Sequence, residues 1–201
     1  MPVHNLQQQL GNIDIYLLDQ ILKERFTHCQ SIFDAGCGSG RNLHWFYQNS
    51  FKIYGIDQNI ERIDAIKKLF TNQKEHFCVQ KLSELTFNDN SFHHSICNAV
   101  LHFAFSKKHF LKMFSELVRV TKNEGIIFIR MTSNFGIKKH ITYLADGKYK
   151  LPDGTHRFLL TKKLVKSVVN HHPIQFIEPI KTVNVNNQRS MTTLVFKKVL
   201  M

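Results

Sequence analysis

The chain is poor in the residues that mark specialised classes of protein. Its 201 residues include only 9 glycines, 4 prolines and 4 cysteines, which excludes collagen-like, low-complexity and disulfide-rich proteins. No run approaches the roughly 18 apolar residues that a membrane span requires, and polar residues interrupt residues 1–25, where a secretory signal would be apolar. The cysteines form no C-x-x-C pair, and no histidine pair has metal-ligand spacing. We therefore expect a soluble, cytoplasmic protein with reduced cysteines, no metal and no membrane partner.

Acidic residues are also scarce, and the imbalance is local. The chain has 27 Lys and Arg against 15 Asp and Glu, and residues 136–201 alone hold twelve against three. A basic segment of this kind can contact the phosphates of a nucleic acid. No four basic residues are consecutive, however, and this favours a solvated, lysine-rich surface.

Two periodicities alternate through the first two thirds of the chain. The β-rich apolar runs predict strands at residues 31–35, 52–56, 76–79, 95–99 and 126–131. Spacing of three to four residues predicts helices at about 13–22, 42–47, 60–70 and 106–118, the last behind an N-cap at Ser106. This alternation predicts an α/β fold, a doubly wound and mostly parallel sheet with helices on both faces.

The pattern changes after Met131. Residues 134–157 combine glycine and proline with aromatic residues and show little periodicity, so we expect an insertion or lid. A helix should begin near Thr161. Two last strands, at about 175–183 and 191–199, predict an antiparallel hairpin at the edge of the sheet. We interpret residues 1–201 as a single domain.

The most informative stretch is FDAGCGSGRN, residues 33–42, which lies between a predicted strand and a predicted helix. Gly36, Gly38 and Gly40 allow a sharp turn and a close approach of a ligand to the main chain. The spacing is G-x-G-x-G, and Arg41 stands where a dinucleotide-binding loop has its third glycine. A pyrophosphate ligand is therefore disfavoured.

Two carboxylates narrow the choice of ligand. Asp34, in the same loop, would repel a phosphate but attract an ammonium group. Asp57 ends the second strand, 21 residues after Gly36, where it can accept two hydrogen bonds from a ribose diol. A ligand with a ribose, an amino group and no phosphate fits both carboxylates, and S-adenosylmethionine is such a molecule.

Four stretches in order resemble the class I S-adenosylmethionine-dependent methyltransferases, over about residues 31–131. They are FDAGCGSG, the acid of GID at residues 55–57, LSELTFNDNSFHHSICNAVLHF at 82–103 and LVRVTKNEGIIFI at 117–129. GSGRN followed by a short helix is also similar to the small tellurite-resistance methyltransferases. The resemblance implies a Rossmann-like methyltransferase fold of about seven strands with the last one antiparallel, and an enzyme that uses S-adenosylmethionine as cofactor.

The resemblance also implies roles for individual residues. The glycines would pass under the methionine moiety, with Asp34 near its amino group and Asp57 on the ribose. The residues expected at the cofactor are Asp34, Gly36, Cys37, Gly38, Gly40, Asp57, Gln58, Leu82, Ser83, Asn98 and Ala99. The sequence departs from the family at Lys81, where an acid often accepts from the adenine amino group, and at His93, where aspartate is usual.

The methyl acceptor is less constrained. His102, after the fourth strand, and Tyr143, in the lid, are the candidate catalytic residues, with His140, His156 and Arg157 as further lid candidates. The chain lacks the Asn/Asp-Pro-Pro-Tyr and Pro-Cys motifs of many nucleic-acid methyltransferases, which favours an unidentified small-molecule acceptor. The alternatives are an RNA methyltransferase that uses residues 136–201, and a non-catalytic S-adenosylmethionine-binding module. Hydride transfer with a nicotinamide is least favoured, and the sequence indicates no oligomeric state.

Overall fold

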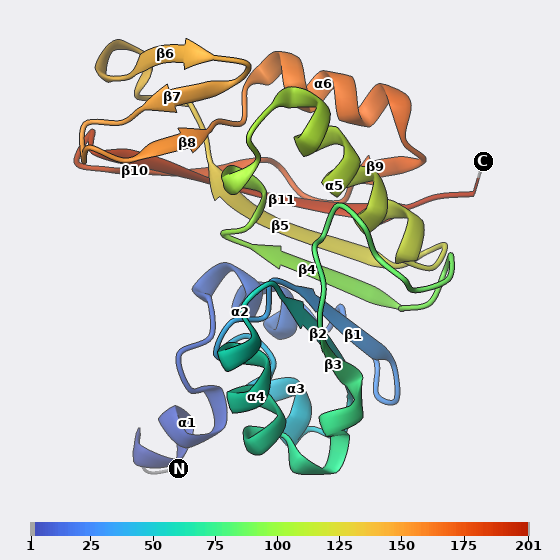
Figure 1. Ribbon diagram of the computed structural model, residues 1–201. Coiled ribbons are helices and arrows are strands. Elements are labelled where there is room, and N and C mark those ends of the chain that lie inside the picture. The colour runs from blue at the N-terminus through green and yellow to red at the C-terminus, as the bar shows by residue number, and fades with distance from the viewer. Residues whose placement is uncertain (1–2, 201) are drawn as a thin grey trace.

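A central eight-stranded sheet organises the computed structural model, which describes residues 3–200 (Figure 1). The main strand order is β10-β11-β5-β4-β1-β2-β3, and β9 also pairs with β11. The first five strands in sequence are β1 (Ser31–Ala35), β2 (Lys52–Asp57), β3 (Phe77–Val79), β4 (His94–Asn98) and β5 (Ile126–Thr132). These five are parallel to one another, and β11 (Arg189–Lys198) runs antiparallel to β5. The prediction of a doubly wound, mostly parallel sheet is confirmed.

Helices cover both faces of the sheet. One face packs against α5 (Lys107–Val120) and α6 (Lys162–His171). The other packs against α2 (Ile15–Leu22), α3 (His44–Gln48) and α4 (Ile60–Leu69). The remaining helical segments are α1 (Val3–Leu10), η1 (Thr71–His76), η2 (Leu101–Phe103) and η3 (Lys138–His140). No helix within residues 3–200 is both long enough and apolar enough to cross a membrane.

Helix α5 illustrates how the sequence encodes these elements. The Ser106 side chain accepts a hydrogen bond from the His109 backbone N–H at 3.0 Å, so it is the N-cap that the sequence predicts. The apolar residues at helical spacing, Phe110, Phe114 and Leu117, are all buried against the sheet. The cap therefore sets where the helix begins, and the apolar stripe sets which face it buries.

The strand order reverses between β1 and β4. From β1 the chain proceeds outward through β2 and β3, and then returns to the other side of β1 to form β4 and β5. In sheets of this type the connections on either side of the reversal leave a crevice at the carboxyl ends of the strands, and this crevice is where ligands bind. The loops after β1, β2 and β4 therefore converge on the region where the sequence places its candidate residues.

The expected strand at 175–183 is two strands. β9 (Ile174–Phe176) and β10 (Lys181–Val185) both pair antiparallel with β11, but their registers differ, because Phe176 opposes Phe196 whereas Lys181 opposes Thr193. The residues between them include Pro179, which has no N–H to donate to the ladder. This interruption gives the sheet eight strands where about seven were expected, while the antiparallel hairpin of β10 and β11 is confirmed.

Residues 134–157 contain more regular structure than their sequence suggests. Strands β6 (Thr142–Ala145), β7 (Lys148–Lys150) and β8 (His156–Phe158) form a separate three-stranded antiparallel sheet. Its strands of three or four residues are too short to produce a recognisable alternation. A backbone hydrogen bond of 3.0 Å from Leu160 N to Thr132 O ties its end to β5. The small sheet thus lies on the side toward which β4 and β5 point (Figure 1).

Candidate functional site

The glycine loop after β1 is held against β2. The backbone N–H groups of Gly36 and Cys37 both donate to Ile56 O at 2.8 Å. Gly36 has a φ of +85°, and a Cβ there would lie 2.4 Å from Val100 Cγ2. Both the backbone conformation and the space therefore require glycine at position 36.

Asp57, at the end of β2, faces the same loop. Its Oδ2 accepts from Gly38 N at 3.1 Å and its Oδ1 accepts from Asn59 N at 3.0 Å. The Arg62 guanidinium lies 3.6 Å from Oδ2 and is largely exposed. A carboxylate has about four lone-pair sites, so these two backbone contacts orient Asp57 and leave it able to accept more hydrogen bonds.

A pocket of about 430 Å³ opens between the loop and the ends of β2 and β4; we call it the loop pocket. Six of the residues expected at a cofactor line it, namely Gly36, Asp57, Gln58, Leu82, Asn98 and Ala99. Ser83 and Lys81 line an adjoining hollow that shares Gln58 and Leu82 with it. The remaining expected residues belong to the strand and loop that support the pocket: Asp34, Cys37, Gly38 and Gly40.

Two polar side chains near this pocket are buried without hydrogen-bond partners among the described residues. They are Asp34, through Oδ1, and Asn98, through both Oδ1 and Nδ2. Burial raises the pKa of Asp34 to about 7, an effect that Arg41 opposes and Asp57 reinforces. Because buried polar groups are almost always satisfied by protein, water or ligand, these atoms point to a polar ligand.

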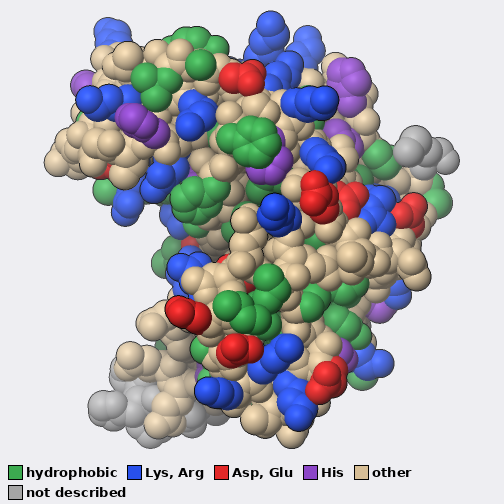
Figure 2. Space-filling model, in the orientation of Figure 1, with side chains coloured by type: hydrophobic (Ala, Val, Ile, Leu, Met, Phe, Trp, Pro, Cys, Tyr) green, Lys and Arg blue, Asp and Glu red, His purple; other side chains and the backbone are tan. Residues whose placement is uncertain are grey.

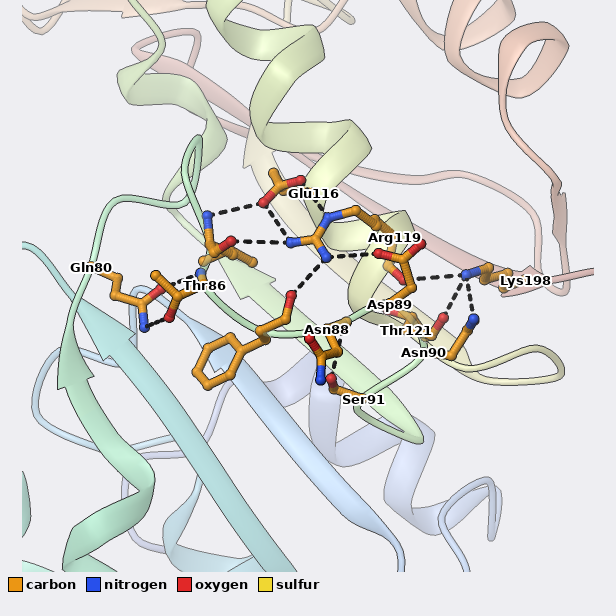
Figure 3. Close-up of polar contacts among 12 residues, drawn as sticks. Gln80, Thr86, Asn88, Asp89, Asn90, Ser91, Glu116, Arg119, Thr121 and Lys198 are labelled. Atoms are coloured by element: carbon orange, nitrogen blue, oxygen red, sulfur yellow. Dashed lines mark hydrogen bonds and ion pairs between the residues drawn. The ribbon is translucent and has the colours of Figure 1, made fainter.

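The segment that brings Leu82 and Ser83 to the pocket is anchored on α5 (Figure 3). Arg119 donates from Nη1 to Phe87 O at 2.7 Å and from Nη2 to Leu85 O at 3.2 Å. Glu116 holds the same guanidinium and also accepts from Leu85 N at 2.9 Å. One ion pair therefore satisfies several backbone groups of a segment without regular structure, and so fixes one wall of the loop pocket.

A second pocket, of about 310 Å³, adjoins the loop pocket at Ala99, which lines both. We call it the arginine pocket because three arginines line it: Arg130, Arg157 and Arg189. Ala99 itself has a φ of +61°, a left-handed conformation that is unusual for a residue other than glycine. In Figure 2 the surface is indented on the side of the strand ends, below the small sheet, and Lys and Arg side chains border the indentation.

Comparison with known proteins agrees with this geometry. Residues 33–129 match the family model described as a methyltransferase domain. This stretch, just under half of the chain, is similar to a methyltransferase domain, and the fold is that of S-adenosylmethionine-dependent methyltransferases. The resemblance of the glycine loop and the GID acid to this family is thereby confirmed.

Three similar proteins, two bacterial and one archaeal, illustrate the likeness. YqeM of Bacillus subtilis (strain 168), whose name describes it as a methyltransferase, is 31% identical over 108 residues; the match covers 53% of this chain and 44% of YqeM. A SAM-dependent methyltransferase structure from Methanosarcina mazei superposes with a TM-score of 0.74 at 19% identity, covering 90% of this chain and 98% of the other. A 1,6-didemethyltoxoflavin-N1-methyltransferase from Burkholderia thailandensis, with bound 1,6-didemethyltoxoflavin and S-adenosylhomocysteine, superposes with a TM-score of 0.70 at 13% identity, covering 98% and 82%. These structures share the fold with this chain.

His102 lies in the arginine pocket. It is buried, and its Nδ1 accepts a hydrogen bond from Thr132 N at 3.4 Å. Burial, assisted by the charge of Arg157, lowers the pKa of His102 to about 4. The imidazole is therefore neutral at pH 7, and its proton is on Nε2, because Nδ1 is the acceptor. His102 is thus set up to donate a hydrogen bond in this pocket.

The other catalytic candidate of the sequence lies elsewhere. Tyr143 is on β6, is 59% exposed and contacts Tyr149 edge-on. It lines a different hollow, with Lys107 and Phe158, and neither the loop pocket nor the arginine pocket. Among the lid candidates, Arg157 lines the arginine pocket, whereas His140 and His156 are exposed and do not. The arginine pocket therefore brings His102 and Arg157 together, whereas Tyr143 lies in a separate hollow.

Sequence reasoning missed two lining residues, Arg130 and Arg189. Arg130 interrupts the otherwise apolar strand IIFIRMT, and this is a signal that could have been used, because a charge in a buried strand needs a partner or a function. Its partner is Asp14, at 2.8 Å. Arg189 carried no such signal, because it lies in a polar stretch of the sequence and begins β11, which pairs with both β10 and β5. No cluster of three potential metal ligands occurs among the described residues.

Proposed function

We propose that the domain binds S-adenosylmethionine in the loop pocket and transfers its methyl group to a small molecule in the arginine pocket. The observation that carries this proposal is that the two pockets meet at Ala99, at the reversal of strand order. One pocket has the residues expected for the cofactor. The other is open to a second molecule and has a volume at the low end of the range for small-molecule sites.

The residues of the loop pocket fit the cofactor. Asp57, already oriented by two backbone donors, would hold the ribose hydroxyls. The unpartnered buried atoms of Asp34 and Asn98 would face the amino-acid end, where a cation is favourable. Gln58 and Leu82 would flank the adenine, with Ser83 in the adjoining hollow. Lys81 lines that hollow with an exposed side chain, and its ammonium group cannot accept a hydrogen bond from the adenine amino group.

When bound, the sulfonium supplies an electrophilic methyl carbon; the acceptor's electron pair forms the new bond to it, and the pair of the broken C–S bond remains on sulfur. The protein's contribution to such a displacement is mainly positioning. Residues 134–157 support this role as an insertion that walls the arginine pocket, because Leu151, Asp153, Thr155 and Arg157 all come from it. His102, neutral and donating from Nε2, would orient the acceptor.

The first test is calorimetric titration with S-adenosylhomocysteine, with NADH as the control ligand. We expect binding of the former alone. Asp57→Ala should weaken that binding by about tenfold or more, since charge-assisted hydrogen bonds are lost. Asp64→Ala removes an equal charge from an exposed position on α4 and should leave it unchanged.

Either of two results would overturn the proposal. One is the absence of S-adenosylhomocysteine binding by a folded protein, and the other is equal affinity of the Asp57 and Asp64 variants. Consumption of S-adenosylmethionine with a panel of small acceptors then separates an enzyme from a binding module. Consumption only in the presence of RNA would replace the small-molecule acceptor with RNA.

A further inference from the structure

The arginine pocket carries more positive charge than its neighbours neutralise. Of its three arginines, Arg130 is paired with Asp14 at 2.8 Å and lies over the Tyr16 ring. Within the described residues, Arg157 and Arg189 have no carboxylate within ion-pair distance. Among the described residues that line the pocket, Asp153 alone is acidic, and its Oδ1 accepts from Thr155 N and Oγ1, at 2.9 and 2.6 Å. These hydrogen bonds and the charges of Arg189 and Arg157 lower its pKa, so one carboxylate faces two arginines.

We propose that the methyl acceptor is a small organic molecule with an oxyanionic group, a carboxylate or a phosphate, that Arg157 and Arg189 bind. This inference rests on the proposed function, because it assigns the arginine pocket to the acceptor. Guanidinium groups match carboxylate and phosphate oxygens with two parallel donors, which makes arginine the residue suited to recognising them.

Arg157 is partly ordered for this task before any ligand binds. Its guanidinium lies 5.0 Å from the centre of the Phe103 ring, and Nη1 donates to His156 O at 2.9 Å. These contacts use the face of the guanidinium and one of its five donors, so other N–H groups remain free. The Nε2–H of His102 adds a neutral donor to the same pocket. Several donors and few acceptors therefore face one small volume.

The rest of the lining describes the remainder of the acceptor. Leu151, Val185 and Met191 supply apolar surface opposite the charged groups. A molecule with an apolar body and one anionic group would satisfy both parts. The anion would fix its orientation relative to Ala99, where the two pockets join. A pocket of about 310 Å³ suits a small molecule of this kind better than the backbone of a nucleic acid, which would follow an extended surface.

Binding of matched probes tests this proposal without any turnover. Benzoate and benzamide have nearly the same shape and differ in charge, and phenyl phosphate distinguishes the second anion. Each is titrated into the ¹⁵N-labelled full chain, with and without S-adenosylhomocysteine, and followed by the amide resonances of Ala99, His102 and Thr132. We expect benzoate or phenyl phosphate to bind at least about tenfold more tightly than benzamide, a difference of about 1.4 kcal/mol.

Variants locate the binding. Arg157→Gln and Arg189→Gln should each weaken binding of the preferred anion severalfold. Lys68→Gln, an equal loss of charge at an exposed position on α4, should not. Equal binding of benzoate and benzamide would overturn the proposal, as would equal losses in all three variants.

A macromolecular anion is the remaining alternative. A single-stranded RNA oligonucleotide that shifts resonances across residues 136–201, while neither aromatic anion shifts Ala99, would also overturn the proposal. The proposed function fails separately, through the absence of S-adenosylhomocysteine binding. Anion binding can be read whether or not that ligand binds, so the two failures are distinguishable.

Discussion

Replacing Asp34 with asparagine should remove a pH dependence from the stability of the protein. Asp34 is 1% exposed, and burial raises its pKa from 3.8 to about 7. The folded state therefore binds this proton more tightly than the unfolded state does. Between pH 3.8 and about 7 the stability that this group contributes falls as pH rises, and above pH 7 it is constant. From pH 5 to pH 8 the loss amounts to roughly 2 to 3 kcal/mol.

The measurement is the free energy of unfolding by urea at pH 5 and pH 8. His94 and His102, whose pKa values burial lowers to about 4, act in the opposite direction between pH 4 and 6.5, so the wild-type curve alone mixes the two effects. The difference between wild type and Asp34→Asn isolates the carboxylate. Asparagine should gain roughly 2 to 3 kcal/mol relative to wild type on going from pH 5 to pH 8.

Ligand binding provides the second half of this prediction. If Asp34 faces the ammonium group of the ligand, its ionised form should bind S-adenosylhomocysteine better. The affinity of the wild type should then rise between pH 6 and pH 7.5, whereas Asp34→Asn should bind more weakly and show a flatter profile. Asp64→Asn, an exposed position on α4, serves as the control. Parallel stability curves for wild type and Asp34→Asn would refute the assignment of a raised pKa, and parallel binding curves would refute the contact.

Three further predictions concern the loop, the anchor of its wall and the thiols. Gly36→Ala should lower the free energy of unfolding by about 2 to 4 kcal/mol, because a Cβ at position 36 would lie 2.4 Å from Val100 Cγ2. Gly154→Ala is the control for backbone strain alone, since Gly154 has a φ of +81° and nothing lies within 4 Å of its Cβ position. Equal urea midpoints for the two variants would refute the clash. Arg119→Ala should lower the free energy of unfolding by about 2 to 4 kcal/mol in the same assay, because the backbone carbonyls that Arg119 satisfies in residues 81–91 lose their donor. A decrease of less than about 0.5 kcal/mol would contradict the role of Arg119 as an anchor. With a thiol reagent at pH 8, exposed Cys29 should react rapidly, while Cys97 should react only after unfolding because burial raises its pKa; fast modification of Cys97 in the native protein would count against this.

Much of the fold could be predicted because its signals are local. The strand at residues 31–35 and the cap at Ser106 depend on neighbouring residues, and the structure places both as expected. The interruption at Pro179 was visible in the sequence but is understood only from the pairing of β9 and β10 with one long strand. The small sheet of β6 to β8 gave no periodic signal, since each of its strands is too short to show one.

The sequence by itself determined the α/β alternation, the glycine loop and the pair Asp34 and Asp57, because loop and acid motifs depend on spacing along the chain. Only the tertiary structure decided what surrounds them. It brought Arg130, Arg157 and Arg189 into one pocket from three segments of the chain, and it made Ala99 the residue at which that pocket meets the loop pocket. It also placed Tyr143 in a separate hollow. These arrangements depend on the pairing of strands that are far apart in the sequence, and no local sequence pattern indicates which distant residues such pairing brings together.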